Sequence, residues 1–170
     1  EAMAGSIDPG NGRGGVAAGK LVASLMAGAD GARVAMVETT GWDTHFNQEG
    51  RLGTVLKGVD EMIDTLRTEM GPVWAKTLIL VATEFGRTVH VNGTRGTDHG
   101  TASAAMLFGG GLVNGGKIIA DWPGLGASQL YEGRDLKPTM RFEAMVIAAL
   151  SSHYGIDPEK LRRTVFPDFP

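Results

Sequence analysis

The sequence places an aspartate and a histidine one residue apart, and a second histidine farther along, in a pattern that suits a metal ion. Asp43 and His45 flank Thr44, and residues i and i+2 of an extended backbone point to the same side. His99 supplies a third donor from a separate glycine-rich segment. Two imidazoles and one carboxylate bind zinc, iron or manganese and leave positions open for water and substrate. We therefore predict one metal site with these three residues as ligands.

Three further charged residues accompany this group. Glu84 ends a short apolar run, and we expect it to be another metal ligand. Asp98 precedes His99, and because sequence neighbours usually face different ways, we place it in a second metal site or behind a ligand histidine. Arg87 follows Glu84 after one turn of loop, and its planar guanidinium could grip an anionic oxygen through two hydrogen bonds. Arg87 is therefore the predicted catalytic residue.

Each of these segments also has a simpler interpretation when it is taken alone. An isolated Asp-x-His is usually a capped turn with a solvated histidine, Glu84 and Arg87 could form only an ion pair, and Asp98 could belong only to a turn. The convergence of all the segments favours the metal site over the separate interpretations. His90 and His153 have no such neighbours in the sequence, and we expect both to be structural or exposed.

The predicted secondary structure would bring these segments to one edge of a sheet. Residues 33–38 and 77–82 are short apolar runs bounded by turn residues, which predicts two buried strands. Between them, apolar residues at steps of three and four over residues 48–70 predict an amphipathic helix that Gly71 and Pro72 end. Strand, helix and strand in this order favour a right-handed crossover and a parallel sheet, and ligands bind beyond the carboxyl ends of such strands. The fold class that we expect is α/β.

The rest of the chain is expected to complete a single α/β domain over residues 1–170. We expect an irregular start at residues 1–13, a helix at 15–26, a third strand at 104–108 and a glycine-rich loop at 109–126. Two further helices are expected at residues 140–154 and from Asp157 onward.

Composition argues against several other classes of protein. The chain has no cysteine, which excludes disulfides, thiolate metal sites and cysteine nucleophiles. A net charge of -3 without a basic run argues against nucleic acid as a partner, and no apolar stretch approaches the roughly 20 residues that span a bilayer. Residues 10–15 fit the G-x-G-x-x-G pattern, but residues 1–9 do not predict the preceding strand that dinucleotide binding requires, so we do not expect nucleotide binding. The G-x-S-x-G elbow of many serine hydrolases is missing as well.

Five segments together resemble a known family. They are GWDTH, EFGRT, GTDHG, WPGL and GRDL, at residues 41–45, 84–88, 96–100, 122–125 and 133–136. Their order and spacing resemble a sulfatase-like family of unknown function (domain of unknown function 1501) in the alkaline phosphatase superfamily. The resemblance runs from about residue 15 to the C-terminus.

The resemblance implies an α/β/α sandwich and a two-metal site that hydrolyses phosphate or sulfate esters. It implies that Asp43, His45 and His99 hold one metal and that Glu84 offers a carboxylate to the second. The expected metal is zinc, with manganese, iron or calcium as alternatives, and the expected substrate is an anionic small molecule or glycan ester. Because relatives commonly carry twin-arginine export signals, the resemblance also implies an exported, periplasmic protein.

The sequence departs from the superfamily pattern at Phe85, where a histidine usually stands beside the carboxylate. The superfamily's early aspartate ligand and its nucleophile would lie before Glu1, so the chain looks like the C-terminal portion of a longer protein. The alternative to a hydrolase is therefore a non-catalytic domain that binds a metal or an anion. An incomplete parallel sheet would also leave an unpaired edge through which the chain could form a homo-oligomer.

Overall fold

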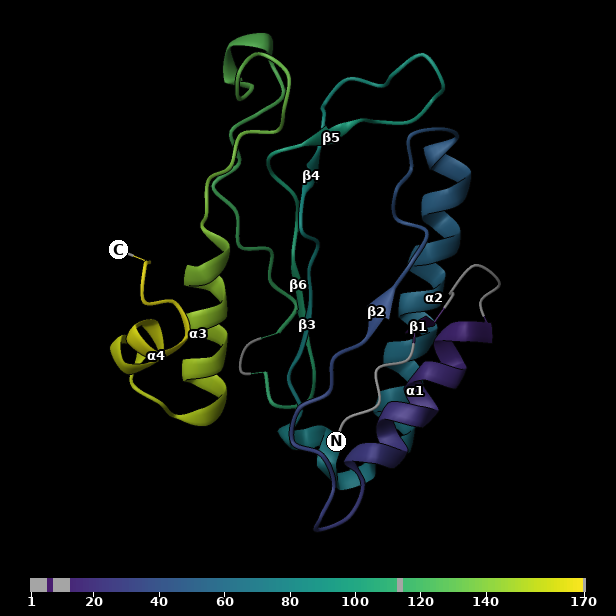
Figure 1. The fold of residues 1–170 in the computed structure, drawn as a ribbon, viewed down its shortest axis with the longest axis vertical. Coiled ribbons are helices and arrows are strands. Elements are labelled where there is room, and N and C mark those ends of the chain that lie inside the picture. The colour runs from purple at the N-terminus through teal and green to yellow at the C-terminus, as the bar shows by residue number, and fades with distance from the viewer. Residues whose placement is uncertain (1–5, 8–12, 113–114, 170) are drawn as a thin grey trace.

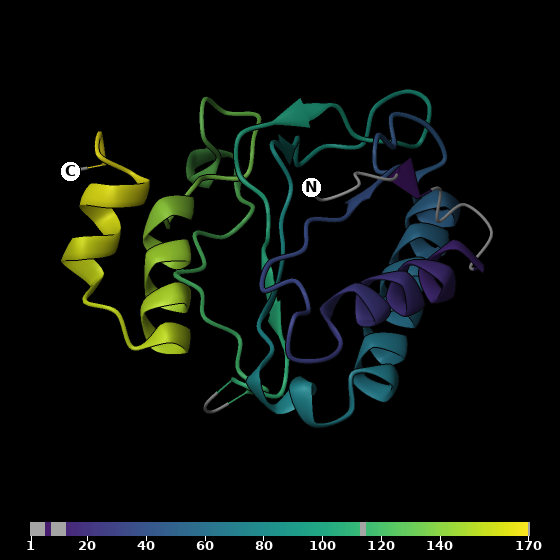
Figure 2. The same cartoon turned by 60° about the horizontal axis from the view of Figure 1, so that its bottom comes forward.

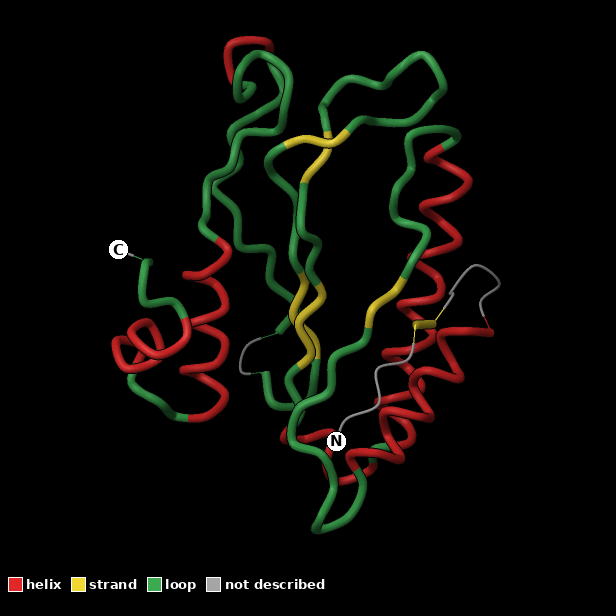
Figure 3. Tube along the Cα trace, in the orientation of Figure 1, coloured by secondary structure: helices red, strands yellow, loops and turns green. Residues whose placement is uncertain are grey.

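The computed structural model describes residues 6–7, 13–112 and 115–169. Figure 1 shows helices on both sides of a set of short strands, and Figure 3 shows how much of the trace between them is loop. The helices are α1 (Arg13–Met26), α2 (Gln48–Glu69), α3 (Phe142–Tyr154) and α4 (Pro158–Val165), with short 3-10 helices η1 (Gly71–Lys76) and η2 (Ala127–Gln129). The strands are β1 (Ser6–Ile7), β2 (Glu38–Thr39), β3 (Ile79–Val81), β4 (Gly86–Arg87), β5 (His99–Gly100) and β6 (Met106–Phe108). The expected α/β content is thus confirmed.

The main hydrophobic core lies between α1 and α2. Ala18, Val22 and Ala23 of α1 pack against Met62, Leu66 and Met70, all of them buried. The helices can approach closely because Gly15 has no side chain. A Cβ atom there would lie 2.1 Å from the carbonyl oxygen of Gly58. The predicted amphipathic helix is confirmed, and each fully buried side chain on its apolar face stabilises the fold by about 1.5–3 kcal/mol. This rigid helix pair supports the loop that enters α2.

A long excursion of the chain occupies the middle of the molecule. β3 pairs antiparallel with β6, and β4 pairs antiparallel with β5, where Arg87 lies opposite His99. Because β3 leads into β4 and β5 leads into β6, residues 79–108 run out and back, and residues 88–98 form the tip (Figure 1). The predicted strands at 77–82 and 104–108 are therefore present, and they are neighbours in the fold.

The predicted strand at residues 33–38 is wrong, since only Glu38 and Thr39 form β2. Val34 is 76% exposed and Met36 is 91% exposed, so this apolar run is not buried in a sheet. Over the described residues the strands form three separate pairs, of which only the short β1–β2 pair is parallel. The expected continuous parallel sheet is not seen in that part of the chain, because the run at 33–37 finds no strand neighbour there.

The C-terminal helices form a second layer, which Figure 2 shows across the central strands from α1 and α2. The predicted helices at 15–26, at 140–154 and after Asp157 are all present. Asp157 caps α4, since its carboxylate accepts a hydrogen bond from the backbone nitrogen of Glu159 at 3.3 Å and Pro158 opens the helix. Ser6 and Ile7 form β1, where the sequence predicts an irregular start, because they pair with Glu38 and Thr39. The expectations for residues 1–5, 8–12 and 113–114, which include the first half of the G-x-G-x-x-G pattern, lie outside the described residues.

A helix that crosses a bilayer needs about 20 mostly apolar residues. Within the described ranges, no helix is long and apolar enough to cross a membrane.

Candidate metal centre

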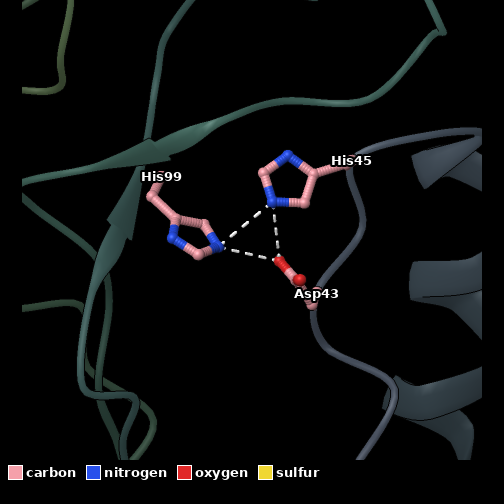
Figure 4. A group of neighbouring side chains, drawn as sticks. All are labelled: Asp43, His45 and His99. Carbon is pink, nitrogen blue, oxygen red and sulfur yellow. Dashed lines mark hydrogen bonds and ion pairs between the residues drawn. The ribbon is translucent and has the colours of Figure 1, made fainter.

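Three side chains from two separate loops direct their donor atoms at one point (Figure 4). Asp43 Oδ1 lies 3.0 Å from His45 Nε2 and 2.8 Å from His99 Nε2. The two Nε2 atoms lie 3.2 Å apart. Among the described histidines and acidic residues, this is the group whose donor atoms lie close enough together to share an ion. The structure thus brings together the three residues that the sequence singles out first.

The loop between β2 and α2 carries Asp43 and His45. Thr44 between them is only 2% exposed, which leaves its two neighbours on the open side of the loop. This alternation is what the i and i+2 spacing predicts. His99 comes from β5, where pairing with β4 fixes its backbone. The donor atoms therefore come from the loop that enters α2 and from the long central excursion.

The two loops are tied together by backbone hydrogen bonds. The nitrogens of Asn47 and Gln48 donate to the carbonyl oxygens of Thr94 and Arg95 at 3.0 and 2.9 Å. Gly96 lies directly against the backbone of His45, since a Cβ atom on Gly96 would be 2.1 Å from the His45 carbonyl carbon. This close approach holds the loop that ends in His99 against the loop that carries His45.

Asp98 lies behind His45 and outside the group of three. Its Oδ1 atom is 3.0 Å from His45 Nδ1. An ionised carboxylate can only accept hydrogen bonds, so His45 Nδ1 carries the proton and donates. In the neutral imidazole the other nitrogen, Nε2, then holds a lone pair. Asp98 thus contacts the ring nitrogen of His45 that lies away from Asp43, and its expected place, in a second metal site or behind a ligand histidine, stays a prediction.

This proton assignment points to a cation in the group. The lone pair of His45 Nε2 faces the Asp43 carboxylate oxygen at 3.0 Å, and two acceptors at that distance repel each other. The contact becomes favourable if a metal ion lies between the donor atoms, or if His45 carries a second proton. A site made of two imidazoles and one carboxylate is a well-known set of ligands for divalent metals.

The spacing of the donor atoms fits one ion. At bond lengths of about 2.1 Å, two ligand atoms lie about 3.0 Å apart at a right angle and about 3.4 Å apart in a tetrahedron. The three observed separations run from 2.8 to 3.2 Å and are closer to the right-angle value. All three donors would then lie on one side of the ion, which leaves the other side for water and substrate.

Hydrogen bonds keep both carboxylates of the centre ionised. In the metal-free chain, the hydrogen bond with His99 is the largest cause that lowers the pKa of Asp43, and the hydrogen bond from Arg87, which needs no proton on His99, adds to it. The pKa of Asp98 is also below its ordinary value, mainly because His45 and then Asn92 donate to it. Both groups are therefore negatively charged at neutral pH, as a metal ligand and its supporting carboxylate need to be.

Arg87 connects the two loops. Its Nη1 donates to the carbonyl oxygen of Thr97 at 2.9 Å, and its Nη2 donates to the carbonyl oxygen of Trp42 at 2.8 Å and to Asp43 Oδ1 at 3.0 Å. The guanidinium also lies 5.3 Å from the centre of the Phe85 ring. Its contacts within the described chain therefore hold a ligand in place, which the sequence pattern did not predict.

Glu84 is exposed, and the structure does not bring it into the group with Asp43, His45 and His99. The neighbouring Phe85 stacks on the His99 ring, with ring centres 4.0 Å apart and an angle of 25° between the planes. Phe85 therefore lies against one of the three donor side chains, whereas Glu84 beside it does not join the group. His90 and His153 also lie outside the group.

The sequence pattern missed two residues that support the centre. One is Phe85, and the other is Asn92, whose side chain contacts both His45 and Asp98. Asn92 precedes Gly93, a pair that indicates a turn and nothing more.

Comparison with known proteins adds one finding. A family model described as "Protein of unknown function (DUF1501)" matches residues 2–165 of the chain. No curated protein and no solved structure gives a significant match.

Proposed function

Because the chain belongs to this family of proteins of unknown function, we propose its activity from the site itself: a metal-dependent hydrolase of phosphate or sulfate esters. The observation that carries the proposal is the triangle of Asp43 Oδ1, His45 Nε2 and His99 Nε2, with sides of 2.8 to 3.2 Å. A divalent ion held by these atoms would lower the pKa of a bound water and polarise an ester oxygen. The resemblance of the five sequence segments to the sulfatase-like family of the alkaline phosphatase superfamily supports the same chemistry.

The residues around the ion have distinct roles in this proposal. Asp98 holds the proton on His45 Nδ1, so that Nε2 can bind the metal. Arg87 holds Asp43 in place and, through its remaining N–H groups, contacts an anionic oxygen of the ester. Phe85 fixes the plane of the His99 ring. The metal that we propose first is zinc, because it binds imidazole and carboxylate ligands and leaves open positions in catalytic sites.

We also propose that these residues belong to an α/β/α sandwich of the alkaline phosphatase type. The sequence resemblance of the five segments supports this part of the proposal. The same resemblance is our reason for expecting an exported protein that acts on an anionic small-molecule or glycan ester.

The proposal is tested by measuring metal content and turnover together. Protein purified without chelators should contain a transition metal by mass spectrometry, and added Zn²⁺ should bind with one ion per chain. Aryl phosphate or aryl sulfate should be hydrolysed, and His45→Ala and His99→Ala should each abolish both metal binding and turnover. His153→Ala is the matched control and should change neither, since His153 lies outside the group. A wild-type chain that takes up no metal under gentle conditions contradicts the proposal.

A second function is favoured by the contacts of Arg87 and the exposure of Glu84. Arg87 donates three hydrogen bonds to acceptors within the chain. Glu84 does not join the group of Asp43, His45 and His99. A domain with these features could bind a metal and an anion, such as a sulfated glycan, without cleaving an ester. Binding of the glycan without turnover favours this function, whereas turnover that is lost in His45→Ala excludes it.

A further inference from the structure

We propose that Asn92 is a positioning residue of the metal centre, whose side-chain amide keeps His45 in the form whose Nε2 lone pair faces the ion. This inference rests on the proposed function, because it assumes that Asp43, His45 and His99 bind a metal. Asn92 itself does not touch the group of three, so it would act through Asp98 and through the backbone of His45.

The amide nitrogen of Asn92 reaches toward the centre. It donates to the backbone carbonyl oxygen of His45 at 2.9 Å and to Asp98 Oδ1 at 3.0 Å. A side-chain amide has two N–H groups, so both hydrogen bonds can form at once. The same Asp98 oxygen accepts the hydrogen bond from His45 Nδ1. The three residues therefore form a closed ring of contacts that fixes both the backbone and the imidazole of His45.

The amide oxygen of Asn92 has a different task, which is to organise the loop. It accepts hydrogen bonds from the backbone nitrogens of Thr94 and Gly96, each at 3.0 Å. The backbone nitrogen of Asn92 also donates to the carbonyl oxygen of Gly96 at 2.9 Å. One half of the amide thus holds residues 92–96 in their turn, and the other half reaches the metal centre.

The consequence for the metal follows from the two forms of neutral histidine. His45 can bind an ion through Nε2 only when its proton is on Nδ1. The Asp98 side chain is 57% exposed, so few other contacts restrain it against rotation. Without the amide nitrogen of Asn92, Asp98 can turn away, and His45 can place its proton on Nε2. That form presents an N–H group to the ion and cannot bind it there.

Asn92→Asp separates the two halves of the amide. The new carboxylate keeps an oxygen for the nitrogens of Thr94 and Gly96, so the loop retains its turn. The donor is lost, and an acceptor then faces Asp98 Oδ1 and the His45 carbonyl oxygen. Asn92→Ala removes both halves and serves as the more severe variant. Asn47→Asp is the matched control, because it makes the same chemical change on a neighbouring side chain that makes no capping hydrogen bond.

The experiment measures the histidine proton and the metal affinity separately in the full chain. Two-bond ¹⁵N–¹H spectra of the metal-free protein report which nitrogen of His45 carries the proton, and calorimetry gives the dissociation constant for Zn²⁺ alone. We expect Nδ1–H in the wild-type chain and in Asn47→Asp. In Asn92→Asp we expect a shift toward Nε2–H and a dissociation constant about 10- to 100-fold higher, with the thermal unfolding of the metal-free chain nearly unchanged.

The inference is overturned if Asn92→Asp keeps the Nδ1–H form and binds Zn²⁺ within about twofold of the wild type. It is also overturned if Asn47→Asp weakens binding as much, because added charge would then explain the effect. If Asn92→Ala fails to fold, Asn92→Asp still tests whether Asn92 positions His45. Should the wild-type chain bind no Zn²⁺, the proposed function fails, while the proton on His45 in the two variants still shows whether Asn92 positions that ring.

Discussion

Gly96→Ala should pull apart the two loops of the metal centre. A Cβ atom at this position would lie 2.1 Å from the carbonyl carbon of His45, 2.2 Å from its oxygen and 2.5 Å from the oxygen of Thr44. All three are backbone atoms, so no side chain can rotate to make room. Ordinary carbon–carbon contacts begin at about 3.5 Å, which means that the loops must separate by about 1.4 Å along the shortest of these lines.

A displacement of this size is large for a metal site. Ligand distances in such sites hold to within about 0.2 Å, so we expect the affinity for Zn²⁺ to fall by at least about tenfold. Forcing a methyl group into a packed position costs about 1–3 kcal/mol of unfolding free energy, and for a chain of this length each kcal/mol lowers the melting temperature by roughly 2–4 °C.

Calorimetric titration with Zn²⁺ and thermal unfolding of the metal-free chain measure the two effects separately. Gly93→Ala is the matched control in the same loop, because a Cβ atom there would meet no heavy atom within 4 Å. The control should bind Zn²⁺ as the wild type does. If Gly96→Ala binds Zn²⁺ with wild-type affinity, or if both variants lose the same affinity, then the close contact between Gly96 and His45 does not determine the geometry of the centre.

Three further predictions concern metal, helix and pH. Zn²⁺ at 100 times its dissociation constant should raise the free energy of unfolding by about 2.7 kcal/mol, and this gain, followed by thermal unfolding, should vanish in His99→Ala; an equal gain in the variant would contradict the site. Gly53→Ala should stabilise the chain by about 0.5–1 kcal/mol in denaturant unfolding, because Gly53 lies inside α2 and a Cβ atom there meets nothing within 4 Å; a loss of stability would refute this. Hydrogen bonds from Arg162 and then Arg163 lower the pKa of Glu159 to about 2 from its ordinary 4.5. Since the folded pKa is the lower one, the stabilisation is present above pH 4.5 and is lost as the pH falls toward 2. The protection of the α4 amides, measured against their intrinsic exchange rates at each pH, should therefore fall in this window in the wild type and not in Glu159→Gln.

The helices of this protein follow from local pattern. The steps of three and four in residues 48–70 predict α2, and Asp157 with Pro158 predicts the start of α4. These signals depend on the spacing of apolar side chains and on capping within a few residues, so they survive without knowledge of the rest of the fold. The run at residues 33–37 shows where local pattern stops predicting structure. An apolar run becomes a strand only where another strand pairs with it, and the residues of the run do not determine that partner.

The metal centre likewise combines features that follow from the sequence with features that only the packing of the chain decides. The sequence determined the candidate ligands, which are Asp43, His45, Glu84, Asp98 and His99, because their side chains carry the oxygen and nitrogen atoms that bind divalent metals. Only the tertiary structure decided that Glu84 stays outside, that Phe85 stacks on His99, and that Arg87 and Asn92 hold the ligands. The contacts of Arg87 with Asp43 and of Asn92 with His45 join residues 44 and 47 positions apart, and their existence depends on how β4 pairs with β5 and on how closely Gly96 approaches His45. Side-chain chemistry is a local property of the chain, whereas the distance between two side chains is set by the packing of everything that lies between them.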